Sequence, residues 1–198
     1  MYNHPNMPAG QTGPGDPAAG DDEVLARQAR DDPQAFAELY HRHAKRIYRF
    51  HLFRTGNAND AQDLTSQTFL AALEGIENYS GHGSLCGWLF GIARHKVADH
   101  YRRRRNDAPL ESAEGLRHPD PSPEETTDAH LKLAQVSGAL KILSPEQTEA
   151  LTLRVFGELS AAEAGRIMGK SEVAVRMLVY RGLRRLRGKL TLSPEVSQ

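Results

Sequence analysis

The sequence has little of what defines several large classes of protein. One cysteine in 198 residues excludes an intramolecular disulfide and a zinc site built from several cysteines. No apolar run reaches the roughly 18 residues that a membrane span needs, and no basic segment followed by an apolar one marks a signal peptide. Lys and Arg together number 25, as do Asp and Glu, so the net charge does not indicate a partner. We therefore expect a soluble, cytoplasmic protein without membrane insertion.

The nine histidines show no spacing typical of a metal site or a catalytic centre. His41 and His43 are two positions apart and would point to different faces of a helix, and the sequence contains no His-Glu-x-x-His motif. A histidine-dependent enzyme is one alternative, but it requires a paired nucleophile or a metal cluster, and neither is visible. We predict no catalytic residue, no metal and no cofactor. The lone Cys86 is interpreted as a small packing residue, with a redox role as the alternative.

Strand signals are nearly absent and helix caps are frequent, so the chain is predicted to be all-α, with two small helical domains. Acidic residues gather before residue 38 and after residue 107, whereas basic residues gather near the ends of both predicted domains. Two separate basic patches in a neutral chain are typical of two anchoring points on a polyanion. The predicted parts are a Pro- and Gly-rich disordered tail (1–20), a helical domain (21–105), a flexible acidic linker (106–128), a helix-turn-helix domain (129–190) and a second tail (191–198).

The first domain is predicted to contain four helices. Asp32 followed by Pro33 is typical of a helix start, and Asn59 is expected to cap the next helix. The loop 78–83 contains two glycines, and Ser84 after it is expected to cap the fourth helix. The expected helices cover residues 21–30, 33–55, 60–76 and 85–105.

The fourth of these helices has two different faces. An apolar stripe that includes Leu89 and Val97 is suited to packing on a core, while Trp88 lies on the opposite side among charged and hydrogen-bonding groups. A tryptophan beside basic residues suggests a surface on which an unpaired base stacks. In the alternative, Trp88 is buried and the arginines at 102–105 are a solvated helix end.

The second domain has clear helix boundaries. Ser144 and Ser160 each begin a capping box, and Gly169 is the first residue of a three-residue turn, 169–171, into a last helix. A short helix, a tight turn and a longer helix form the helix-turn-helix pattern. Val175, Leu178, Val179, Gly182 and Leu186 are expected to face inward, and Val173, Arg176, Met177, Tyr180 and Arg184 outward.

Three segments resemble the bacterial RNA polymerase sigma factors of the compact, two-domain extracytoplasmic-function (ECF) type. They are DAQDLTSQTFLAAL (60–73), WLFGIARHKVADHYRRR (88–104) and the stretch from LSPEQTEALTLRVFGELS to YRGLRRLR (143–187). The resemblance covers both predicted domains, in the same order, with a linker between them. It implies that the chain binds core RNA polymerase, directs it to promoters and helps to melt the DNA, without catalysing a reaction itself.

The resemblance also implies site residues. Those for the minus-ten element are Trp88, Arg94, His95, Lys96, Asp99, Arg102 and Arg103. Those for the minus-thirty-five element are Ser171, Arg176, Met177, Tyr180, Arg181 and Arg184. Those for the polymerase are Asp60, Asp63, Gln67, Phe69 and Leu73.

The partners implied are core RNA polymerase, through its β′ clamp helices and β flap, promoter DNA and an anti-sigma factor. Two further alternatives use the same basic surfaces. A stand-alone helix-turn-helix regulator would bind duplex DNA without polymerase, and an RNA-binding protein would use Trp88 and its neighbouring arginines.

Overall fold

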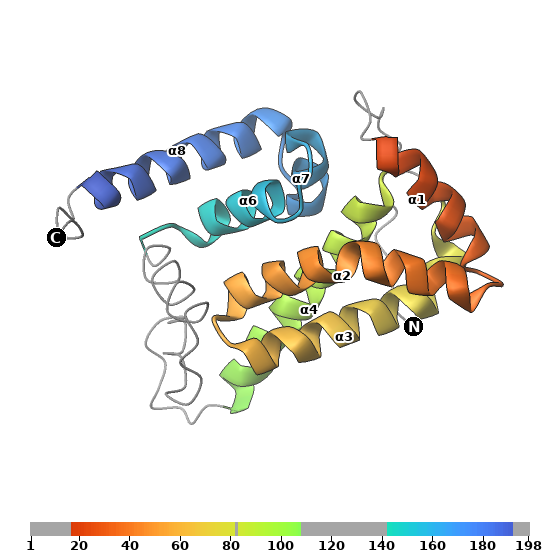
Figure 1. The fold of residues 1–198 in the computed structure, drawn as a ribbon. Coiled ribbons are helices and arrows are strands. Elements are labelled where there is room, and N and C mark those ends of the chain that lie inside the picture. Colours follow the sequence, from red (N-terminus) through yellow and green to blue (C-terminus); the bar gives the residue numbers. More distant parts are fainter. Residues whose placement is uncertain (1–16, 82, 108–141, 192–198) are drawn as a thin grey trace, which may run out of the picture.

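The computed structural model describes residues 17–81, 83–107 and 142–191, and every element in these ranges is helical (Figure 1). This confirms the predicted all-α fold. Most of both predicted tails, most of the linker and residues 129–141 of the second predicted domain lie outside the described residues. Among those described, no helix combines the length and the apolar character needed to cross a membrane. The elements are α1 (Pro17–Gln28), α2 (Pro33–Thr55), α3 (Ala58–Gly75), the 3-10 turn η1 (Ile76–Asn78), α4 (Leu85–Asp107), α6 (Pro145–Val155), α7 (Ala161–Met168) and α8 (Glu172–Thr191).

Most helix starts follow the capping residues in the sequence. The side chain of Asp32 accepts a hydrogen bond from the backbone N–H of Gln34 at 2.8 Å, and proline occupies the first position of α2, as predicted. The hydroxyl of Ser84 accepts from the N–H of Gly87 at 3.1 Å at the start of α4. These caps satisfy N–H groups that have no partner within their own helix.

The start of α3 corrects the prediction, because Asn57 and not Asn59 is the cap. Asn57 has an extended backbone, and its side chain accepts from the N–H of Asp60 at 3.0 Å. The hydroxyl of Thr55 contacts both the carbonyl and the N–H of Asn57, at 3.1 and 3.3 Å. This contact holds Asn57 outside the helix and leaves Asn59 inside the first turn. Other boundaries also differ from expectation: α1 runs from Pro17 to Gln28 in place of 21–30, α3 ends at Gly75, and α4 continues to Asp107.

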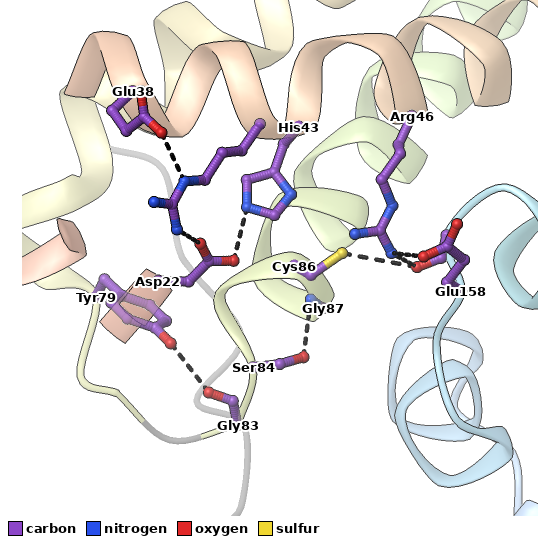
Figure 2. A network of polar contacts seen from close by, with 12 residues as sticks. Asp22, Glu38, His43, Arg46, Tyr79, Gly83, Ser84, Cys86, Gly87 and Glu158 are labelled. Carbon is purple, nitrogen blue, oxygen red and sulfur yellow. Dashed lines mark hydrogen bonds and ion pairs between the residues drawn. The ribbon is translucent and has the colours of Figure 1, made fainter. Parts of the chain in front are cut away.

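The core of the first domain lies between α2, α3 and α4. Phe50 of α2 and Phe90 of α4 are fully buried and meet edge to face, with ring centroids 5.4 Å apart. Helix α1 is attached to this core by a buried polar contact, in which Asp22 lies 2.8 Å from the ring of His43 (Figure 2). Burial raises the pKa of Asp22, but hydrogen bonds from His43 and Arg42 outweigh that effect and lower it.

The second domain has the helix-turn-helix arrangement that the sequence predicts. Both capping boxes are present: Ser144 accepts from the N–H of Gln147 at 3.3 Å, and Ser160 from that of Glu163 at 3.1 Å. Gly169 ends α7 in the left-handed region, at φ 65°. Helices α6 and α7 both pack against α8. The turn therefore fixes the angle at which α8 leaves α7.

The two domains also contact each other. In Figure 1, α6 and α7 lie beside α2 and α4, while α8 lies on the far side of the second domain. Phe53 of α2 packs against Phe156, which follows α6, with ring centroids 4.9 Å apart. The apolar core is therefore continuous across the two domains.

Candidate nucleic-acid and polymerase interface

Helix α4 has the two faces predicted for it. Leu89, Phe90, Ala93 and Val97 are buried against the first domain. The opposite face carries the exposed residues His95, Arg102 and Arg103 and the half-buried Lys96 and Asp99. Asp99 accepts a hydrogen bond from Arg102 at 2.8 Å. The exposed side is therefore basic, with one acid that orients a neighbouring arginine.

Trp88 lies between the two alternatives drawn from the sequence, because it is half-buried. Its ring contacts the ring of Tyr79 at 5.3 Å between centroids, and its apolar edge packs against the core. The Tyr79 hydroxyl donates to the carbonyl of Gly83 at 3.0 Å, and Arg30 donates to the carbonyl of Tyr79 at 2.8 Å. Burial raises the pKa of Tyr79 to about 12, so this donor stays protonated. Tyr79 and Arg30 support Trp88, and sequence reasoning missed both.

Arg94 is not free in this structure. Its guanidinium forms an ion pair with Glu149 of α6, which belongs to the second domain. Arg94, one of the residues expected at the minus-ten element, is therefore occupied by an interdomain ion pair.

Helix α8 presents its expected residues to solvent. Val175 is fully buried, whereas Arg176, Met177, Tyr180, Arg181 and Arg184 are exposed. Tyr180 is 61% exposed, which is unusual for a large aromatic side chain unless it contacts a partner. Ser171 accepts a hydrogen bond from the N–H of Ala174 at 3.2 Å and so caps α8.

The outer face of α3 differs from the prediction in two residues. Asp63, Gln67 and Leu73 are exposed as expected, but Phe69 is buried in the core and unavailable to a partner. Asp60 lies 3.5 Å from His100 and 3.4 Å from Arg104, so it pairs within the domain. Two exposed apolar side chains near this face were missed: Leu70, at 57%, and Tyr40, at 42%. The step of three from Gln67 to Leu70 and from there to Leu73 was the signal for Leu70.

The structure gives Cys86 a packing role. Burial raises the pKa of its thiol to about 12, so it stays protonated and unreactive near neutral pH. Its Sγ donates to the carbonyl of Gly157 at 3.7 Å (Figure 2). No group of three or more His, Cys, Asp or Glu side chains is placed to hold a metal ion in the part of the chain that the structure describes.

Comparison with known proteins identifies the family. Residues 39–106 match the family model of sigma-70 region 2, and residues 133–186 match that of sigma-70 region 4. The chain belongs to the RNA polymerase sigma factors. This sigma factor carries α4 within its region 2 match, and most of α8, through residue 186, within its region 4 match.

The relatives place this sigma factor in the ECF type. It is 38% identical over 178 residues to the ECF RNA polymerase sigma factor BldN of Streptomyces coelicolor, covering 86% of this chain and 67% of BldN. It is 30% identical to the RNA polymerase sigma factor CnrH of Cupriavidus metallidurans, covering 88% of this chain and 96% of CnrH. A third relative, the ECF sigma factor SigE of Mycolicibacterium smegmatis, is 35% identical, and the alignment spans 60% of its length.

Solved structures share the fold of this sigma factor. CnrH in complex with the cytosolic domain of CnrY superposes with a TM-score of 0.69 at 25% identity, covering 87% of this chain and 98% of that one. RpoE in complex with the anti-sigma factor NepR from Bartonella quintana superposes with a TM-score of 0.66 at 22% identity, covering 80% and 98%. As an ECF sigma factor, the protein binds core RNA polymerase, directs it to specific promoters and takes part in DNA melting.

Proposed function

We propose that α4 recognises the minus-ten element, α8 the minus-thirty-five element, and the outer face of α3 the polymerase. The observation that carries this proposal is the row of exposed side chains on α8, headed by Arg176, on a helix whose other face is buried. A helix that follows a tight turn and exposes basic and aromatic groups fits the major groove.

Within α8, two kinds of contact are proposed. Arg176 lies in the second turn, near the end of the helix that enters the groove, where an arginine can bond guanine O6 and N7 together. Arg181 and Arg184 lie further along and are better placed for phosphates, which position the helix without recognising sequence. Met177 and Tyr180, with Ser171 at the cap, complete the proposed surface. We expect the first two turns of α8 to set the base preference of this surface.

Within α4, the proposal places single-stranded DNA on the basic face. The half-buried Trp88 lies at the start of that face, with its ring against that of Tyr79. Stacking of an unpaired base on an aromatic ring contributes about 1–3 kcal/mol, comparable to the cost of unstacking that base in the duplex. His95, Lys96, Asp99, Arg102 and Arg103 supply hydrogen bonds and charge along the strand, together with Arg94 once it is released.

The exposed side chains of α3 support polymerase docking. Gln67, Leu70 and Leu73 recur at helical spacing and form an exposed strip, in which Leu70 and Leu73 are apolar and Gln67 and Asp63 are polar. An exposed apolar strip with a polar rim is typical of a protein interface. We assign this strip to the β′ clamp helices, and the second domain to the β flap.

The proposed mechanism requires no chemistry from this chain. Each domain alone binds DNA weakly and with a strong dependence on salt. Core polymerase fixes their separation, so that binding of the second element becomes effectively intramolecular. Catalysis belongs to the polymerase, and we place the protein with it in the cytoplasm.

We also propose control by a protein antagonist. Two solved structures that share this fold are complexes of sigma factors with another protein, CnrY in one and the anti-sigma factor NepR in the other. A similar partner here would bind the surfaces that polymerase and DNA need.

Run-off transcription with purified core polymerase on pooled genomic promoters tests the proposal. We expect new, discrete transcripts with this protein, a loss of at least tenfold in Trp88→Ala and Arg176→Ala, and little change in the control Arg49→Ala on the exposed surface of α2. A loss of about 2 kcal/mol, within the range for one base contact, corresponds to a factor of about 30. Polymerase-independent binding to a discrete duplex site, with no new transcript, would instead identify a stand-alone regulator.

A further inference from the structure

The apolar contact between the two domains is accompanied by several polar ones. The carbonyls of Phe156 and Gly157 both accept from Arg46, whose guanidinium also lies 3.6 Å from Glu158 (Figure 2). Ser84 donates to Glu163 of α7 at the start of α4. The interdomain contact comprises Arg46, Phe53, Ser84, Cys86 and Arg94 on region 2, and Glu149, Phe156, Gly157, Glu158 and Glu163 on region 4.

This closed arrangement is incompatible with simultaneous binding to both promoter elements. The centres of the minus-ten and minus-thirty-five elements lie about 25 base pairs apart, which is roughly 85 Å at about 3.4 Å per base pair. A compact chain of this length has a radius of gyration of only about 16 Å. Region 4 must therefore leave region 2 before both helices reach DNA.

Glu149 is one of the acids in this contact. Its side chain is 15% exposed and pairs with Arg94, one of the residues assigned above to the minus-ten strand. Arg54, at the end of α2, is a half-buried cation whose charged form the same carboxylate favours. Burial lowers the pKa of Arg54 and Arg94 lowers it further, while Glu149 acts in the opposite direction. The carboxylate thus offsets part of the repulsion between the two arginines.

We propose that the interdomain contact is autoinhibitory, and that Glu149 fills an anion site formed by Arg54 and Arg94 which takes a DNA backbone phosphate once region 4 moves away. The inference rests on the function proposed above and adds Arg54 to the DNA surface. A carboxylate and a phosphate present similar oxygens to a guanidinium, and arginine binds both. If region 4 moves away and no anion replaces the Glu149 carboxylate, Arg54 and Arg94 lose their counter-charge. Binding of a DNA phosphate and separation of the two domains therefore favour each other.

The test uses the full chain without polymerase, and a labelled oligothymidine of about 20 nucleotides as the probe. Glu149→Gln keeps the shape of the side chain and removes its charge. We expect it to raise affinity for the probe by about fivefold, and to increase the radius of gyration measured by small-angle X-ray scattering. Glu146→Gln is the matched control, because Glu146 also lies on α6 but pairs with Lys170 inside region 4, at 2.7 Å. It should change neither quantity.

Arg54 is tested in the Glu149→Gln background. Adding Arg54→Gln should remove the gain in affinity and reduce the slope of log affinity against log salt by about 0.7, the value for one phosphate contact on a single strand. Arg54→Lys should retain the slope, and circular dichroism melting checks that each variant is folded.

Wild-type compactness and affinity in Glu149→Gln would overturn the autoinhibitory contact. An unchanged salt slope in folded Arg54→Gln would overturn the phosphate site. Because the assay contains neither polymerase nor a promoter, either failure leaves the transcription result intact. If the variants behave as expected with the probe but the protein gives no new transcript with core polymerase, the proposed function is contradicted and the interdomain contact is not.

Discussion

His51 is buried inside region 2 and has a hydrogen-bond partner on only one of its ring nitrogens. Its Nε2 lies 3.0 Å from the hydroxyl of Thr68, which itself donates to the carbonyl of Leu64 at 2.7 Å. The Thr68 oxygen must therefore accept, so His51 carries its proton on Nε2. Its buried Nδ1 has no partner within the described chain. A second proton on that nitrogen would place an unpaired charge in the core.

This geometry predicts sensitivity to acid. Burial lowers the pKa of His51 from 6.5 to about 3, with smaller effects from Arg54 and His100. Between these values the unfolded chain binds a proton that the folded chain does not, so the free energy of unfolding falls as pH decreases below about 6.5. The contribution of this one group is about 1.4 kcal/mol per pH unit.

Urea unfolding from pH 8 to pH 5 measures the effect. His51→Gln keeps a donor for Thr68 and cannot titrate, so its free energy of unfolding should depend less steeply on pH than that of the wild type. His41→Gln, at an exposed position on the same helix, is the control and should retain the wild-type slope. Equal slopes in all three proteins would show that the pKa of His51 is the same in the folded and the unfolded protein.

At the level of elements, the helix-turn-helix depends on a close approach at Gly165. A Cβ at this position would lie 2.6 Å from the carbonyl oxygen of Lys170, a backbone atom that a side-chain movement cannot relieve. The N–H of Lys170 donates to the carbonyl of Gly165 at 2.8 Å, which closes the turn onto α7. The angle between α7 and α8 therefore depends on the missing side chain.

Gly165→Ala should lower the free energy of unfolding by about 2 kcal/mol, as overpacking does elsewhere, and weaken duplex binding by α8. Gly188→Ala is the matched control, because a Cβ there meets nothing within 4 Å and alanine is the better helix former. It should leave stability unchanged or raise it by up to about 1 kcal/mol. Thermal and urea unfolding of both variants give the comparison, and a Gly165→Ala protein as stable as the wild type would contradict the account of the turn.

The elements also show which features a sequence can predict. The capping boxes at Ser144 and Ser160 were predicted because both partners lie within four residues, where local spacing decides the contact. The cap of α3 was misplaced because Asn57 and Asn59 give equal local signals. Thr55, which holds Asn57 extended, decides between them.

The candidate site was predicted as far as amphipathic spacing allowed. The exposed residues of α8 and the buried stripe of α4 follow from helical periodicity. Burial of Phe69 and pairing of Asp60 with His100 depend on neighbouring helices, which no single helix pattern shows. Arg94 and Glu149 are 55 positions apart, and only the folded chain brings them together.

For the whole molecule, promoter recognition as proposed requires two DNA-recognising helices that polymerase holds at one separation. The helix-turn-helix alone would bind one element and tolerate any distance to a second. Two domains fixed on core polymerase would not tolerate a different distance, because a longer or shorter spacer between the elements moves one element away from the helix that recognises it. Promoter spacing therefore distinguishes a two-domain initiation factor from a single-site regulator.

The most direct measurement is run-off transcription from a promoter recovered with this protein, after insertion of about five base pairs between its two elements. The insertion rotates one element by about half a helical turn and shifts it by roughly 17 Å. We predict that the transcript falls at least tenfold while each element remains intact, and that a single-base substitution within the spacer changes it little. A transcript of undiminished strength from the lengthened promoter would contradict recognition of two elements by α4 and α8.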